Sequence, residues 1–276
     1  MKKIALVLFV ALTAVASANG QEKIKFFNHL SVGVDAGLAG FGADVAMPIV
    51  SRWVDVEAGF TIMPKFKYST ELDLDRFDYK DANGVSRVLD KTNLKEIPVQ
   101  GKLNMVNGKV LFNFYPMAIS GFHITVGAYF GKSSIVEVYN KIDGQLSPIN
   151  EANAEIDKYN KNIAIPNGLE QQQKIGLELD DYLLTPDSKG NAKASLKVHG
   201  FKPYVGIGFG RAVPKTKRIG FKVDLGAMFW GSPDIVDHNG HSLLSGIGSD
   251  DGGAIKVIKK FKVYPVLNFR LCGRIF

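Results

Sequence analysis

The chain lacks two features that commonly hold exported and membrane proteins together. Cys272 is its single cysteine among 276 residues, which excludes an intramolecular disulfide. The longest uncharged apolar run covers 4–16, which is shorter than the roughly 18 residues that a membrane-spanning helix requires. Every later apolar stretch is interrupted by charge, glycine or proline before it reaches that length. The sequence therefore predicts a mature protein without a transmembrane helix.

The amino terminus has the pattern of a secretory signal peptide. Lys2 and Lys3 precede the apolar run, and small residues at 16–18 form a cleavage pattern. We expect 1–20 to be removed, which leaves 21–276 as one domain. A retained membrane anchor is the alternative, and the short apolar run disfavours it.

The charge balance argues against a nucleic-acid partner. The formal net charge is +7, and subtracting Lys2 and Lys3 leaves +5. Acidic and basic residues are interspersed rather than gathered in one basic patch. Export from the cytoplasm also separates the chain from nucleic acid, so no such partner is expected.

Hydropathy alternates with a period of two, which is the pattern of β-strands. In 219–230 the apolar residues alternate with charged, small or flexible ones. The apolar set is Phe221, Val223, Leu225, Ala227 and Phe229, and the opposite set is Lys222, Asp224, Gly226 and Met228. Similar alternation covers nine or more residues elsewhere, close to the length with which a tilted strand crosses a bilayer.

This pattern predicts an all-β fold, an eight-stranded antiparallel transmembrane barrel. The expected strands are 29–38, 41–50, 53–66, 97–116, 122–139, 197–212, 219–231 and 257–275. Short connections are expected on the periplasmic side, and long outer loops at 67–96, 140–196 and 232–256. Within the middle loop, 150–160 predicts a short polar helix, and 175–184 either a prolonged strand or a small hairpin.

Two structural alternatives stay open at this point. A soluble β-sandwich also alternates, but its strands are usually shorter and its connections do not alternate between tight and long. The segment 97–116 contains Asn107-Gly108, which could mark either a bulge or a hairpin. A hairpin would change the strand count.

Charged residues of both signs occupy the polar side of the strands, and we expect them to face the lumen. An eight-stranded barrel has little interior space beyond its side chains, and buried charges must pair. The prediction is a charge network that closes the lumen, with a lining that selects ions as the alternative. The predicted network residues are Asp35, Asp44, Asp55, Glu57, Lys102, Lys222, Asp224, Lys262, Arg270 and Arg274.

The sequence predicts no catalytic, metal or cofactor site. His238 and His241 fall in an expected outer loop, where a solvated turn is favoured over a metal site. Neither His123 nor His199 has a nucleophile at a spacing that suggests hydrolysis. We therefore expect a protein that is not an enzyme.

The motifs KPYVGIGFGRAVP at 202–214 and YPVLNFRLCGRIF at 264–276 resemble those of small outer-membrane barrels of the OmpA/OmpW type. The predicted charge-filled narrow lumen beneath loops 67–96, 140–196 and 232–256 favours a monomer with a structural or surface-interaction role, whose partners bind through these loops. The resemblance implies a location in outer-membrane lipid, after insertion by the barrel-assembly machinery. The alternative that it suggests is OmpW-like transport of small apolar molecules that enter through these loops.

Overall fold

A computed structural model describes residues 29–50, 53–90, 94, 96–117, 120–179, 182–242 and 261–275. The predicted signal peptide 1–20 and the second half of the predicted loop 232–256 lie outside these ranges. Across the described parts of the chain, no helix is both long enough and apolar enough to cross a membrane.

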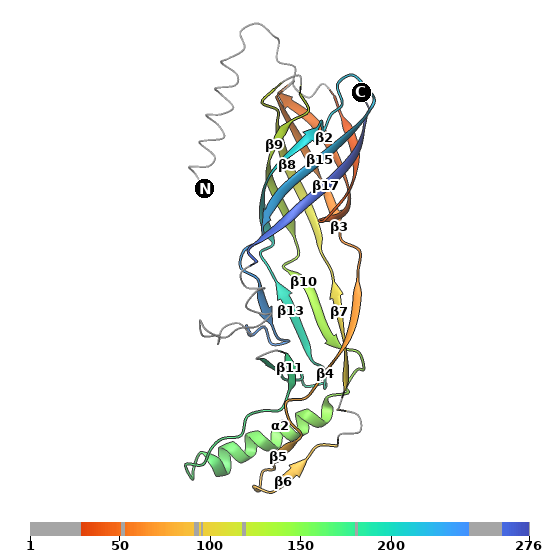
Figure 1. The fold of residues 1–276 in the computed structure, drawn as a ribbon. Helices are drawn as coiled ribbons and strands as arrows, with labels where there is room; N and C mark the ends of the chain where they lie inside the picture. Colours follow the sequence, from red (N-terminus) through yellow and green to blue (C-terminus); the bar gives the residue numbers. More distant parts are fainter. Residues whose placement is uncertain are drawn as a thin grey trace.

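Eight antiparallel strands form a closed barrel, which confirms the predicted fold class (Figure 1). Each barrel strand pairs with the barrel strands before and after it in the chain, and the last pairs with the first. The register of that closing pair places Asp35 opposite Arg270. The barrel strands are β1 (Ser31–Gly37), β2 (Gly40–Val50), β3 (Val54–Ile62), β8 (Val106–Phe114), β9 (His123–Gly131), β14 (Phe201–Gly210), β15 (Ile219–Phe229) and β17 (Val263–Arg274).

The two faces of the barrel wall have opposite chemistry. On β14, Phe201 and Phe209 are exposed on the outside, whereas Lys202 and Tyr204 are buried inside. The other barrel strands alternate in the same way, because successive side chains of a strand point to opposite faces. The period-two pattern of the sequence thus sorts apolar side chains outward and polar ones inward.

Five barrel strands continue beyond one rim as a second sheet. Its order is β4 (Lys67–Leu72), β7 (Ile97–Leu103), β10 (Ser134–Asn140), β13 (Lys193–Lys197) and β16 (Asp234–Val236). These strands adjoin β3, β8, β9, β14 and β15 along the chain, and in Figure 1 the sheet prolongs the barrel wall. We call this sheet the outer sheet.

The outer sheet corrects several predicted boundaries. The segment 97–116 is neither one strand nor a hairpin: β7 and β8 follow each other through a break at 104–105. The predicted strand 122–139 is divided in the same way at 132–133. The predicted loops 67–96 and 140–196 contain strands of the outer sheet, two short hairpins and a helix.

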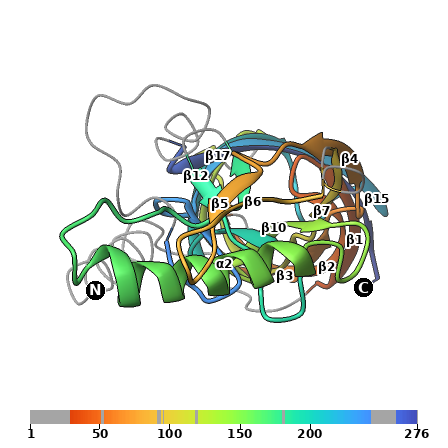
Figure 2. The same cartoon turned by 90° about the horizontal axis from the view of Figure 1, so that it is seen from below.

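A small head caps the outer sheet and shares one apolar core with it. Helix α2 (Ser147–Tyr159) and the π-helical turn η2 (Asn160–Ala164) follow β10, and Figure 2, seen from below, shows α2 across this end. Two hairpins complete the head, β5 (Asp78–Lys80) with β6 (Ser86–Val88) and β11 (Leu177–Leu179) with β12 (Tyr182–Leu184).

The head core explains why α2 forms. Ile149, Ala152 and Ile156 lie on one face of the helix at the spacing of a helical stripe, and each is buried. They pack in one cluster with residues of the outer sheet such as Ile97 and Val99. The predicted polar helix at 150–160 therefore exists, but it is amphipathic and longer at its amino-terminal end.

Candidate functional site: the charged lumen of the barrel

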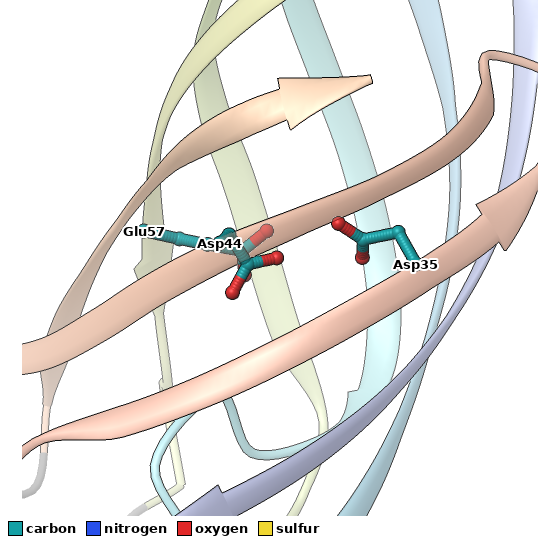
Figure 3. A group of neighbouring side chains, drawn as sticks. All are labelled: Asp35, Asp44 and Glu57. Atoms are coloured by element: carbon teal, nitrogen blue, oxygen red, sulfur yellow. The ribbon is translucent and has the colours of Figure 1, made fainter. Parts of the chain in front are cut away.

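Three carboxylates converge in the middle of the barrel. Asp35, Asp44 and Glu57 extend from β1, β2 and β3 (Figure 3), and one carboxylate oxygen of each lies within 4.8 Å of the other two. Gly59 pairs with Asp44, and a Cβ at that position would overlap the Asp44 side chain. The glycine thus makes room for three acids at one level of a narrow lumen.

Lys109 occupies the position that a cation would take among these acids. Its Nζ lies 2.5 Å from Asp35, 2.9 Å from Asp44 and 2.8 Å from Glu57, and all four side chains are fully buried. The ammonium group has three hydrogen-bond donors, one for each carboxylate. The cluster is therefore neutralised by a side chain and leaves no vacant ligand position for a metal ion.

Two further cations extend the network. Lys222 Nζ lies 3.0 Å from both Glu57 and Asp224. Arg270 donates from Nε to Asp44 at 2.8 Å, and the guanidinium lies where a side chain at Gly33 would collide with it. Because each cation contacts a carboxylate directly, the desolvation of these charges is largely offset by pairing.

The network continues toward the rim that carries the short turns. His123 Nε2 lies 2.7 Å from Asp224, and its Nδ1 lies 3.0 Å from the carbonyl of Gly121. Thr125 donates to Asn113 at 2.8 Å beside them. Charged and polar groups thus fill this half of the lumen.

The connection between β14 and β15 turns inward and covers the same rim. The carbonyl of Ala212 accepts hydrogen bonds from Ser31 Oγ at 2.6 Å and from Arg270 Nη1 at 2.7 Å. The backbone N–H of Ala212 donates to the hydroxyl of Tyr115 at 3.0 Å. Because Ala212 is fully buried, this turn serves as a lid on the network.

An apolar layer lies on the other side of the network, toward the outer sheet. It consists of Ala39, Leu111, Tyr129, Tyr204, Met228 and Val266. Tyr129 and Tyr204 meet edge to face with ring centroids 5.5 Å apart. A second cluster with Met105 and Trp230 lies where the barrel passes into the outer sheet. The lumen is therefore charged in one half and largely apolar in the other.

The structure brings most of the predicted network residues together. Asp35, Asp44, Glu57, Lys222, Asp224 and Arg270 are joined by direct ion pairs. Asp55 faces the lumen as predicted and is buried, but its Oδ2 has no hydrogen-bond partner among the described residues. It lies apart from the ion-paired core.

Three predicted members lie outside the network. Lys102 belongs to β7 of the outer sheet, where it pairs with Lys67 and Glu137. Lys262 precedes β17 and is exposed. Arg274 ends β17 and donates to the carbonyl of Pro214 at 3.2 Å. Alternation identifies the inward side of a strand but not the points at which the barrel begins and ends.

Two buried lysines of the lumen, Lys109 and Lys202, are not among the residues predicted from the sequence. In 98–104 the predicted inward-facing positions are even-numbered, whereas in β8 they are odd-numbered, because a break at 104–105 separates the two strands. Lys109 therefore fell on the predicted outer face. Counting back from Asn113 in steps of two identifies it, since 109 and 113 share one face. Lys202 shares the inward phase of Tyr204, and it is fully buried.

No protein-family model and no curated protein matches the sequence. Solved structures with a similar chain path include CarO2 of Acinetobacter baumannii, at 13% sequence identity and a TM-score of 0.44, covering 91% of this chain and 100% of that one. CarO of the same organism is 14% identical with a TM-score of 0.42, covering 88% and 96%. A major outer membrane protein of Thermus thermophilus is 15% identical with a TM-score of 0.31, covering 90% and 99%.

Proposed function

We propose that the protein is an integral outer-membrane barrel whose lumen is closed by the buried charge network, and whose outer sheet and head form an interaction surface. The protein acts as a monomer, inserted by the barrel-assembly machinery. The observation that carries this proposal is the complete burial of Lys109 among three carboxylates in a narrow barrel.

The outer face of the barrel supports a location in lipid. Large apolar side chains there are exposed along every strand, including Val34 at 57% and Phe209 at 67%. Leaving such a belt in water costs about 25 cal/mol for each Å² of apolar surface. A bilayer removes that cost, and the barrel strands other than the seven-residue β1 have 9 to 12 residues, a length suited to crossing it.

The contents of the lumen support closure rather than conduction. The side chains of Lys109, Lys222 and Arg270 are each fully buried and held by carboxylates. An ion could pass only by displacing these pairs, and breaking a buried pair costs several kcal/mol. The inward turn at Ala212 adds a second barrier.

The head and the outer sheet support an interaction role, because the eight barrel strands close the barrel without them. Edge strand β4 is exposed over nearly its whole length, with Tyr68 beside Phe66 as exposed aromatic residues. Exposed aromatic side chains are enriched at protein interfaces. A surface partner would therefore contact this edge of the outer sheet.

Single-channel recording in planar bilayers tests the closed lumen. We expect no discrete openings from the refolded wild-type protein, and measurable openings after Arg270→Ala, which removes a cation and loosens the turn at Ala212. Heat-modifiable migration on a gel verifies that each sample is folded. Reproducible wild-type openings would show that the network lines a conducting path.

Transport of small apolar molecules is the second candidate, and the apolar layer around Tyr129 and Tyr204 favours it. An entering ligand would first contact Trp230, whose ring lies tilted against that of Tyr264 with ring centroids 4.8 Å apart. Brominated alkanes added to the folded protein should then quench Trp230 fluorescence. Equal quenching in wild type and in a Trp230→Phe variant, which retains Trp53, would exclude this route.

A further inference from the structure

One buried cation in the lumen has no acidic partner. Lys202 is fully buried, and its Nζ donates to Asn107 Oδ1 at 2.8 Å. No carboxylate of the described chain lies within ion-pair distance of this Nζ, whereas Lys109, Lys222 and Arg270 each have one at 3.0 Å or less. A buried ammonium group without a counter-charge is strongly unfavourable. Its surroundings therefore lack one negative charge.

Two further polar atoms at the same level also lack partners. Within the described residues, the Nδ2 of Asn107 and the Oγ1 of Thr61 are buried and make no hydrogen bond. Thr61 and Asn107 are directly paired across β3 and β8, so their side chains are neighbours on the lumen face. Because the Asn107 Oδ1 accepts from Lys202, its Nδ2 is the free donor.

Gly131 leaves room for the contact between Lys202 and Asn107. It lies opposite Asn107 on β9, the strand between β8 and β14. A Cβ at Gly131 would overlap the Asn107 side-chain oxygen, so any larger residue would block the reach of Lys202 across β9. The absence of a side chain is what allows the lysine and the amide to meet.

We propose that Lys202, Asn107 and Thr61 form a binding site for a small oxyanion, a carboxylate or a phosphate group, at the outer end of the lumen. Lys202 supplies the charge and two remaining N–H donors, Asn107 supplies the two N–H donors of Nδ2, and Thr61 supplies its hydroxyl. A water molecule could satisfy the neutral groups, but it would leave the lysine charge uncompensated.

Two methionines cover the site on the side of the outer sheet. Two positions from Thr61 and Asn107 toward that sheet are Met63 and Met105, which pack in one cluster. Methionine side chains are flexible and adapt to irregular space. An oxyanion that enters from the outer sheet would have to displace these two side chains.

Calorimetric titration of the purified protein in neutral detergent tests the site, with sodium acetate and sodium phosphate as probes in chloride buffer of constant ionic strength. We expect saturable binding of at least one oxyanion. Affinity should fall about tenfold or more in Lys202→Met and severalfold in Thr61→Val, the losses expected for charged and neutral hydrogen bonds. The matched control is Lys197→Met, which removes an exposed lysine from the neighbouring β13 and should bind as wild type.

The relative affinity of the two probes assigns the source of the oxyanion. Tighter acetate binding indicates a carboxylate ligand, and tighter phosphate binding indicates a phosphorylated one. Thermal unfolding gives a second readout: in chloride alone, Lys202→Met should unfold at a higher temperature than wild type, because the uncompensated charge is gone. Equal binding by wild type and Lys202→Met, or no binding with unchanged unfolding temperature, would overturn the proposal.

Discussion

At the residue scale, Lys109 holds together three strands that would otherwise repel one another. It bonds to acids on β1, β2 and β3 from its own place on β8. Removing one partner of a buried ionic cluster leaves the remaining charges uncompensated. The contribution of Lys109 is therefore larger than that of one exposed ion pair.

We expect Lys109→Met to lower the free energy of unfolding by about 3–5 kcal/mol, the range found for breaking buried pairs. Urea unfolding in lipid vesicles, followed by fluorescence, measures the change. As a control, Lys197→Met at an exposed site should alter stability by less than about 0.5 kcal/mol. Equal losses in the two variants would mean that the network does not stabilise the fold.

The residue scale also shows what alternation can predict. Asp35, Asp44 and Glu57 were found because they share the inward phase of strands with clear alternation. Lys102 on β7 was predicted to face the lumen, but alternation of polar and apolar residues does not show whether a strand belongs to the barrel or to the outer sheet. Which acid meets which cation depends on the register between strands, and register is a tertiary property.

Asp81 in the head gives a pH-dependent prediction outside the barrel. The backbone N–H of Val85 holds the pKa of Asp81 below its usual value of 3.8, assisted by Arg87 and by the N–H of Asn83. A lowered pKa means that the stabilisation is complete above pH 3.8 and is lost as the pH falls through the lower folded value.

Amide proton shifts of Val85 and Asn83, measured by NMR during acid titration, follow this change directly. We expect both shifts to move with one midpoint below pH 3.8. An Asp81→Asn variant keeps the side-chain size and should show no such transition. A midpoint at or above the usual value would contradict the hydrogen-bonded arrangement.

At the element scale, the stability of α2 depends on its buried face. The same substitution at a buried and at an exposed position of the helix separates the effect of burial from the effect of aspartate on helix formation. Ile156 is fully buried in the head core, whereas Ala154 is exposed on the same helix. We expect Ile156→Asp to destabilise the head by more than about 3 kcal/mol, because it removes a core side chain and buries a charge. Ala154→Asp should have little effect.

Limited proteolysis distinguishes these outcomes. In Ile156→Asp, cleavage should appear within the head, while the barrel keeps its heat-modifiable migration. Cleavage should stay at the wild-type level in Ala154→Asp. Unfolding of the barrel together with the head would show that the two cores form one cooperative unit.

The elements differ in how well the sequence predicts them. Barrel strands such as β15 are predictable because apolar residues hold the outward-facing positions along the whole strand, which makes the alternation strict. The sequence predicts β7 and β10 as parts of barrel strands, β4, β13 and β16 largely as loops, and α2 as a polar helix, since short strands and small apolar stripes give weak periodic signals. Their core is assembled from segments far apart in the chain.

At the scale of the whole molecule, replacing an exposed valine by a charged residue should cost more stability on the barrel than in the head. Val34 lies in the middle of β1 on the outer barrel face, and Val88 ends β6 in the head; both are exposed, at 57% and 69%. In the proposed membrane location, lipid surrounds Val34 and water surrounds Val88. Exposure alone therefore does not predict the cost of a charge.

We expect Val34→Lys to lower stability in vesicles by about 2–4 kcal/mol, the cost of a lysine near the bilayer midplane. Val88→Lys should be nearly neutral. Urea unfolding of both variants in vesicles measures the difference. Two equal, small effects would place the barrel in water rather than in lipid.

The pairing of β1 with β17 has a consequence for how the protein folds. It joins the first and last barrel strands, so it closes the longest loop in the chain. The same last strand delivers Arg270, which Asp44 on the second strand requires as a partner. A partly assembled barrel without β17 therefore has excess acid in its interior. Sealing the wall and balancing the interior charge are one event, and the slow step of folding should be the arrival of the final strand.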